Sequence, residues 1–234
     1  MASMRDIKRR KGSVQSTQQI TKAMKLVSTV KLQRARTTAE RSKSYFEYMF
    51  TTVNSILSKV GNLKHPYLQA GESRKKAVLV ITSNRGLAGG YNSNVVKLIT
   101  GQDWKKEDVV IYAIGNKGRD ALARSGYEIA GDWSHVIEEP AYTEARAIAD
   151  VLLKAYENGE VGEIYLAYTF FKNTVSHIPT LIKLLPVDIS QEKSEDQGPS
   201  AIMNFEMEEE AALDLIIPKY VASLLRRDGG SSGQ

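Results

Sequence analysis

A glycine-rich stretch at residues 82–92 is the part of this sequence whose residue types could do chemistry. It reads Thr-Ser-Asn-Arg-Gly-Leu-Ala-Gly-Gly-Tyr-Asn and directly follows an apolar run. In parallel α/β sheets, a glycine-rich loop after the first strand commonly binds phosphate at the N-terminus of the next helix. The spacing here is neither G-x-G-x-x-G nor G-x-x-x-x-G-K-[ST], and no lysine directly follows the last glycine. We therefore favour a tight turn or a protein contact over nucleotide binding, with positive φ at glycines and with Asn92 or Ser93 capping the next helix.

The sequence offers few other groups for catalysis or metal binding. It contains no cysteine, and its three histidines lie too far apart for a metal-ligand spacing. Glu138 and Glu139, like the acidic run at residues 208–210, are expected to be solvated surface rather than a general acid and base. A second glycine-bearing turn at residues 115–118 has the same structural interpretation as the first. We predict no catalytic residue, no metal site and no cofactor.

From residue 75 onward, strand-like and helix-like segments alternate. Continuous apolar and β-branched runs predict buried strands, the last antiparallel to its neighbour, at residues 77–82, 108–115, 127–130 (the weakest), 163–171 and 178–187. Helical stretches lie between them at residues 94–100, 118–125 and 143–158. This alternation predicts an α/β fold, with a Rossmann-like doubly wound sheet over residues 75–190.

The chain begins with a segment that is typical of one long helix, over about residues 6–60. It has no proline, no glycine after Gly12, and many strong helix formers. Its apolar residues are sparse at first (Ile20, Met24 and Val27) and then denser, at Phe46, Met49, Phe50, Val53, Ile56, Leu57 and Val60. So narrow a stripe over this length favours a coiled-coil seam. We therefore assign residues 1–62 to a long N-terminal coiled-coil helix that requires a partner helix.

Positive charge is concentrated in this first helix. Residues 1–43 carry twelve Lys and Arg against two acids, whereas the whole chain has a net charge of +5, so the remainder is net acidic. A cationic helix can neutralise nucleic-acid phosphates or fit an acidic protein surface. Residues 5–43 contain no aromatic residue to interleave with bases, which favours a protein partner. Nucleic-acid binding stays as the alternative.

The C-terminal part has a different composition. Residues 190–200 are polar and contain proline and glycine, which predicts a mobile loop. Residues 201–227 are typical of a short strand followed by a helix, whose start three glutamates would stabilise. Residues 228–234 form a tail rich in glycine and serine. No apolar run approaches the roughly 20 residues that span a bilayer, and the charged N-terminus lacks the apolar core of a secretory signal.

Two motifs give the chain a family resemblance. Residues 13–32, SVQSTQQITKAMKLVSTVKL, closely resemble the N-terminal helix of the γ subunits of F-type ATP synthases, which reads S-V-x-x-T-x-x-I-T-x-A-M-x-M-V-(S/A)-x-x-K. Residues 81–94 resemble that family's second motif, S-D-R-G-L-(C/A)-G-G-(Y/F/L)-N. His65, Pro66 and Tyr67 match the family's usual break after the first helix. The resemblance covers about residues 1–225.

This resemblance implies a central rotor shaft with no catalytic site of its own. In the family, the N- and C-terminal helices form an antiparallel coiled coil inside a ring of α and β subunits. The Rossmann-like domain below holds the ε subunit and the membrane c-ring. Rotation couples proton or sodium flow to ATP synthesis or hydrolysis in the α/β head. The resemblance thus implies a peripheral subunit at the cytoplasmic face of a bacterial plasma membrane, without a nucleic-acid partner.

The resemblance also implies contact residues and shows departures from the family pattern. The α and β subunits would be contacted by Ile20, Met24, Lys25, Val27, Arg85, Gly86, Gly89 and Gly90, and the ε subunit and c-ring by Met203 and Phe205. Lys11 stands where the family usually has an apolar residue, and Asn84 replaces the usual Asp, keeping its capping ability without the charge. The long helix that the family continues beyond Leu225 is missing. We therefore expect a truncated C-terminal helix, with residues 228–234 outside the family pattern.

Overall fold

The computed structural model describes residues 3–60, 65–69, 71–138, 141–173, 176–187 and 216–224. Within the first helix, side chains are described as far as residue 37 and at residues 48, 51 and 52.

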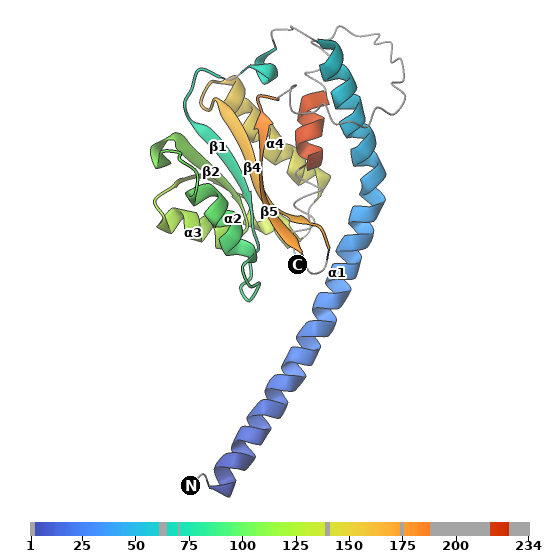
Figure 1. Cartoon of the computed structure of the whole chain (residues 1–234), viewed down its shortest axis with the longest axis vertical. Coiled ribbons are helices and arrows are strands. Elements are labelled where there is room, and N and C mark those ends of the chain that lie inside the picture. Colours follow the sequence, from blue (N-terminus) through green and yellow to red (C-terminus); the bar gives the residue numbers. More distant parts are fainter. Residues whose placement is uncertain are drawn as a thin grey trace.

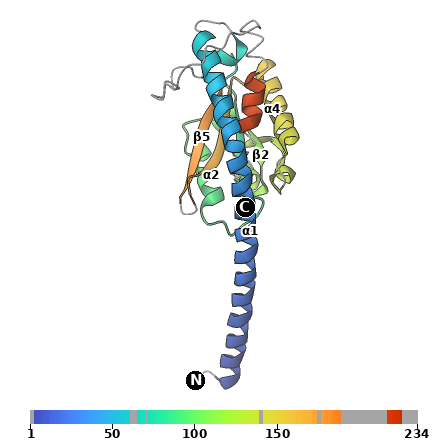
Figure 2. The ribbon, with the colours of Figure 1, turned by 90° about the vertical axis from the view of Figure 1, so that its right-hand side faces the viewer.

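The first helix, α1 (Met4–Val60), is continuous over 57 residues, about 85 Å at 1.5 Å per residue. It confirms the helix predicted over residues 6–60. Its N-terminal half extends beyond the sheet domain, and its C-terminal half lies beside that domain (Figures 1 and 2). Every side chain from residue 3 to residue 31 is exposed. The apolar residues predicted to thicken the stripe between residues 46 and 60 lie outside the described side chains.

The described strands form one sheet in the order β3-β2-β1-β4-β5. They are β1 (Lys76–Ile81), β2 (Val109–Ile114), β3 (Glu128–Asp132), β4 (Glu163–Phe171) and β5 (His177–Leu185). The first four are parallel, and β5 pairs antiparallel with β4, as predicted. Apart from Lys76, the residues of the two central strands β1 and β2 are buried. This burial on both faces explains their continuous apolar runs.

Helices cover both faces of the sheet, which confirms the doubly wound α/β fold. α2 (Tyr91–Thr100) and α3 (Asn116–Arg124) pack on the face that carries Val78 and Val80. α4 (Tyr142–Glu157) packs on the opposite face, which carries Leu79 and Ile81. Successive residues of β1 thus serve two separate cores, because side chains alternate across a strand. The short helices η1 (Pro66–Leu68), η2 (Lys106–Asp108) and η3 (Ser134–Glu138) lie in the connections.

A last helical segment, residues 216–224, packs on the same face of the sheet as α4. Its Ile217, Val221 and Ala222 are buried in that core. The segment lies between α4 and α1 (Figures 1 and 2). The predicted loop at residues 190–200, the strand that would contain Met203 and Phe205, and the tail at residues 228–234 lie outside the described residues.

Candidate functional site

A groove of about 660 Å³ lies between α1 and the glycine-rich loop that follows β1. Met24, Lys25 and Val27 line it from α1, and Arg85 and Gly86 line it from the loop. The fold therefore brings five of the eight predicted α/β contact residues to one surface, although their two motifs are far apart in the sequence. The other three, Ile20, Gly89 and Gly90, are not among the lining residues.

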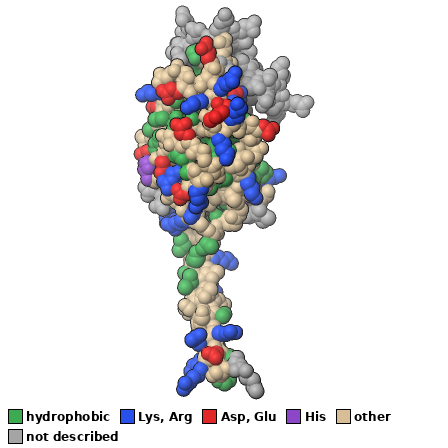
Figure 3. Space-filling view, turned by 90° about the vertical axis from the view of Figure 1, so that its left-hand side faces the viewer, with side chains coloured by type: hydrophobic (Ala, Val, Ile, Leu, Met, Phe, Trp, Pro, Cys, Tyr) green, Lys and Arg blue, Asp and Glu red, His purple; other side chains and the backbone are tan. Residues whose placement is uncertain are grey.

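An apolar stripe on α1 includes Met24 and Val27, two of the residues that line the groove. Ile20, Met24 and Val27 are 59%, 54% and 57% exposed, and their spacing of four and then three residues places them on one face of the helix. Hydrophobic side chains alternate with Lys and Arg along the projecting part of the molecule (Figure 3). A half-exposed apolar stripe on a long helix is the surface expected where a partner packs.

Hydrogen bonds of the Ser83 and Asn92 side chains fix the base of the glycine-rich loop. The Asn92 Oδ1 accepts the backbone N–H of Ser83 at 2.9 Å, and its Nδ2 donates to the Ser83 Oγ at 2.9 Å. The Ser83 hydroxyl donates to the carbonyl of Arg85 at 2.7 Å. The prediction that Asn92 or Ser93 caps the next helix is wrong, because α2 begins at Tyr91 and has no side-chain cap. Asn92 therefore lies inside the first turn, from which its side chain reaches back to the loop.

The turn itself uses two residues in the left-handed region. These are Gly89, with φ of 56°, and Leu87, with φ of 62°. The expected positive φ at glycines is thus confirmed for Gly89, but it is wrong for Gly90, whose φ is −82°, and for Gly86, whose φ is not positive. The second left-handed position belongs to a residue with a large side chain.

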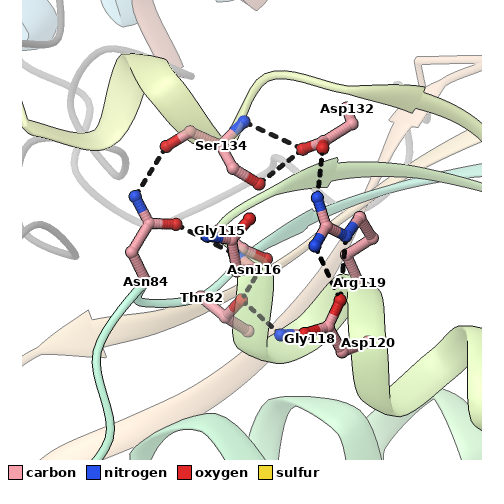
Figure 4. Close-up of polar contacts among 9 residues, drawn as sticks. All are labelled: Thr82, Asn84, Gly115, Asn116, Gly118, Arg119, Asp120, Asp132 and Ser134. Carbon is pink, nitrogen blue, oxygen red and sulfur yellow. Dashed lines mark hydrogen bonds and ion pairs between the residues drawn. The ribbon is translucent and has the colours of Figure 1, made fainter.

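Asn84 connects the loop to two other elements (Figure 4). Its Oδ1 accepts the N–H of Asn116 at the start of α3 at 2.9 Å, and its Nδ2 donates to the carbonyl of Ser134 in η3 at 2.7 Å. The expected capping ability of this Asn is therefore used, but for α3 rather than for the helix that follows it. A carboxylate at this position would keep the first bond and lose the second, because it has no donor.

The first three N–H groups of α3 all bond to protein acceptors. These acceptors are the Asn84 Oδ1, the Ser83 carbonyl at 3.2 Å and the Thr82 Oγ1 at 2.8 Å. A helix N-terminus binds phosphate through N–H groups that are free to donate. The bonding at the turn over residues 115–118 therefore favours its structural interpretation.

Gly115 brings the start of α3 against the end of β1. Its φ is 108°, and a Cβ at this position would lie 2.1 Å from the backbone carbonyl oxygen of Thr82. The Thr82 hydroxyl donates to the carbonyl of Gly115 at 3.1 Å. Glycine is therefore needed here both for its backbone conformation and for the close approach.

Asp132 fixes the η3 side of this network (Figure 4). It accepts the Ser134 N–H at 2.9 Å and the Ser134 hydroxyl, and it pairs with Arg119, which also bonds Asp120 at 2.8 Å. Partial burial raises the pKa of Asp132, but hydrogen bonds from Ser134 and Arg119 outweigh it and hold the pKa below its ordinary value of 3.8. Sequence reasoning missed this network, because no spacing or motif marks its members.

Two further findings bear on possible functions. Among the described residues, no three His, Asp or Glu side chains gather where they could hold a metal ion. Of the helices that the structure describes, none is both long enough and apolar enough to cross a membrane.

Comparison with known proteins finds a family model and several relatives that agree with one another. A family model described as ATP synthase matches residues 3–227. The ATP synthase gamma chain of Lachnoclostridium phytofermentans is 62% identical, covering 96% of this chain and 79% of that protein. The gamma chain of Alkaliphilus metalliredigens is 40% identical, over 95% of this chain and 78% of that protein. A gamma chain from Acetobacterium woodii that is named sodium ion specific is 36% identical, covering 94% of this chain and 78% of that protein.

A solved structure supports the fold. A chain of the central stalk and c-ring of the Tetrahymena thermophila mitochondrial ATP synthase aligns with a TM-score of 0.63 at 21% identity, covering 92% of this chain and 94% of that one. These comparisons give no support to the alternative of nucleic-acid binding. Because the family model matches nearly the whole chain and one gamma chain is 62% identical to it, the chain belongs to the ATP synthase gamma chain family.

Proposed function

We propose that this chain is the central rotor shaft subunit of an F-type ATP synthase. It couples ion translocation through the membrane ring to ATP synthesis or hydrolysis in the α/β head. The family match over residues 3–227, with 62% identity to a gamma chain, is the observation that carries the proposal. The relative named sodium ion specific keeps sodium beside the proton as a candidate coupling ion.

In this role the chain transmits motion, and other subunits carry out the chemistry. The N–H groups of α3 support this division, because Thr82, Ser83 and Asn84 already accept the first three of them. Arg119, the cation that belongs to that network, is paired with two carboxylates. The role needs no cofactor bound to the chain.

The surface that we propose for the α/β head comprises Ile20, Met24, Lys25, Val27, Arg85, Gly86, Gly89 and Gly90. The groove between α1 and the loop supports this assignment, as does the exposed stripe beside it. The assignment of Met203 and Phe205 to the ε subunit and c-ring rests on the family resemblance alone.

We also propose a division of the chain into functional segments. Residues 1–62 are the shaft helix, residues 75–190 the Rossmann-like domain and residues 190–200 a loop. Residues 201–227 are a strand and the start of the C-terminal shaft helix, and residues 228–234 a tail. Membership of the family makes the chain a peripheral part of a membrane-bound complex. The bacterial relatives support a position at the cytoplasmic face of the plasma membrane.

Co-purification with the α and β subunits of the Lachnoclostridium synthase tests this function. We expect a stable assembly that hydrolyses ATP faster than α and β subunits alone. Met24→Glu should weaken assembly without unfolding the chain, because Met24 is 54% exposed. Failure of the chain to bind, or binding that leaves hydrolysis unchanged, would contradict the proposal.

A further inference from the structure

A segment between α1 and β1 is bonded closely to the sheet domain. Residues 65–69 and 71–73 of this segment are here called the connector. It lies at the end of the domain where α1 ends (Figure 1). Connecting segments usually run over the surface and are more mobile than the elements that they join. The connector differs, because His65 and Tyr67 are only 3% and 4% exposed.

Tyr67 bonds the connector to two other parts of the domain. Its hydroxyl donates to the carboxylate of Glu157, the last residue of α4, and its carbonyl accepts the N–H of Val187, just after β5, at 3.0 Å. Its own N–H donates to the Nδ1 of His65 at 3.2 Å. All three polar groups of Tyr67 are therefore bonded, and the residue belongs to the core on the α4 face of the sheet.

The rest of the connector is bonded to α4 and to the turn that follows α4. The Tyr156 hydroxyl donates to the carbonyl of Gln69 at 2.5 Å. The Ser73 hydroxyl donates to the carbonyl of Glu160 at 3.1 Å. The connector is thus held along its length by groups that belong to the sheet domain.

Two glycines bring the connector against the turn before β4. The N–H of Gly71 donates to the carbonyl of Gly162 at 3.2 Å. A Cβ at Gly162 would lie 2.1 Å from the carbonyl oxygen of Ser73, and a Cβ at Gly71 would lie 2.9 Å from the Cα of Gly162. These are contacts of backbone on backbone, so a change of side-chain rotamer cannot loosen them.

The proposed function requires that rotation pass between the sheet domain and α1. The side chains of residues 3–31 of α1 are all exposed, so the domain holds that part of the helix little. A mobile joint at the other end of the helix would let the domain turn without turning the shaft. A buried segment with many hydrogen bonds opens rarely, which makes it suitable for this task.

We infer that the connector is a fixed joint that transmits torque between the sheet domain and the shaft helix, with Tyr67 as the positioning residue that holds it. The inference rests on the proposed function and adds to it the segment that carries the torque and the residue on which that segment depends.

Amide exchange in the free chain tests whether the joint is fixed. Tyr67→Phe removes one hydrogen bond and keeps the ring, so the N–H groups of Gly71 and Val187 should exchange about fivefold faster. Tyr165→Phe is the matched control, because the Tyr165 hydroxyl also donates to a glutamate, Glu163, but lies outside the connector. It should leave both rates unchanged. Unprotected N–H groups in the unsubstituted chain, or equal rates in Tyr67→Phe, would overturn the inference.

Ion transport by the assembled synthase tests whether the joint carries torque. The chain is reconstituted in lipid vesicles with the other subunits of the Lachnoclostridium synthase, and ATP hydrolysis is measured together with the uptake of protons and of sodium. Tyr67→Ala should keep hydrolysis and lower the number of ions transported per ATP, whereas Tyr165→Ala should keep both. A merely structural role of Tyr67 would lower hydrolysis and transport together.

Tyr67→Phe should lower the same ratio by a smaller amount, and it decides the question if Tyr67→Ala does not assemble. An unchanged ratio in the Tyr67 variants that assemble would overturn the inference and leave the proposed function standing. If the unsubstituted chain does not couple hydrolysis to transport, the proposed function fails and the torque-carrying role fails with it.

Discussion

Replacing Gly115 with alanine should destabilise the chain strongly, because Gly115 touches the end of β1. The new Cβ would lie 2.1 Å from the carbonyl oxygen of Thr82, well inside the 3.0 Å that real Cβ atoms respect. The atom in the way belongs to the backbone, so a side-chain rotation cannot relieve the overlap. The end of β1 and the start of α3 must move apart.

The expected loss follows from the contacts that this movement breaks. A left-handed backbone costs a residue with a Cβ about 1–2 kcal/mol. Separation also breaks the hydrogen bonds of the Thr82 hydroxyl with the Gly115 carbonyl and the Gly118 N–H, each worth about 1 kcal/mol. The free energy of unfolding should therefore fall by about 3–4 kcal/mol, out of roughly 5–15 kcal/mol for a typical protein.

Urea unfolding followed by circular dichroism measures this loss, with Gly126→Ala as the matched control. Gly126 also has a positive φ, of 86°, but nothing lies within 4 Å of its Cβ position. The control should therefore lose only the backbone contribution, about 1–2 kcal/mol. Equal losses in the two variants would refute the reasoning that close packing on Thr82 requires Gly115.

Three further predictions concern the same domain and the shaft. Asn84→Ala should lower the free energy of unfolding by about 1–3 kcal/mol. Asn84→Asp should lower it by less, because the carboxylate keeps the acceptor for the N–H at the start of α3. Equal losses for the two variants in urea unfolding would exclude the capping role of Asn84. Partial burial raises the pKa of Glu163, but Lys183 and Lys76 outweigh it and hold the pKa below its ordinary value of 4.5. The stabilisation from Glu163 is therefore complete above that ordinary pKa and is lost as the pH falls through the folded pKa, so Glu163→Gln should flatten the acid limb of stability against pH. Amide exchange in the free chain should be fast across residues 15–31 of α1, where every side chain is exposed, and slow in the buried strand β1; strong protection of the helix would contradict the exposed shaft.

The strands were predictable where the sheet is covered on both faces. β1 and β2 are buried, and their sequences are continuous apolar runs, so the run length alone located them. β3 is the weakest prediction, because this edge strand alternates between exposed and partly buried residues. Its sequence therefore lacks the continuous apolar run that marks β1 and β2. The sequence pattern predicts the start of α2 three residues too late, because the helix begins at Tyr91 after a glycine without a side-chain cap.

The network around Asn84 could not be predicted from local sequence. Capping signals are read from neighbours within a few positions, whereas Asn84 caps a helix 32 positions away and donates to a carbonyl 50 positions away. The parallel sheet creates these contacts by bringing the ends of neighbouring strands together. The groove illustrates the same limit, because the residues alone do not show that Met24 and Arg85 share a surface. Nor does the sequence pattern indicate that Leu87, with glycines close by, takes a left-handed position.

Site-specific cross-linking tests most directly whether the groove between α1 and the glycine-rich loop faces the α/β head. The chain contains no cysteine, so Lys25→Cys introduces a single thiol that a photoactivatable maleimide can label before assembly. Val151→Cys on α4 places the same label on an exposed residue outside the groove. We expect illumination of the assembled complex to link the chain to an α or β subunit from position 25 and not from position 151. Linkage from position 151 but not from position 25 would contradict the assignment of the groove to the head.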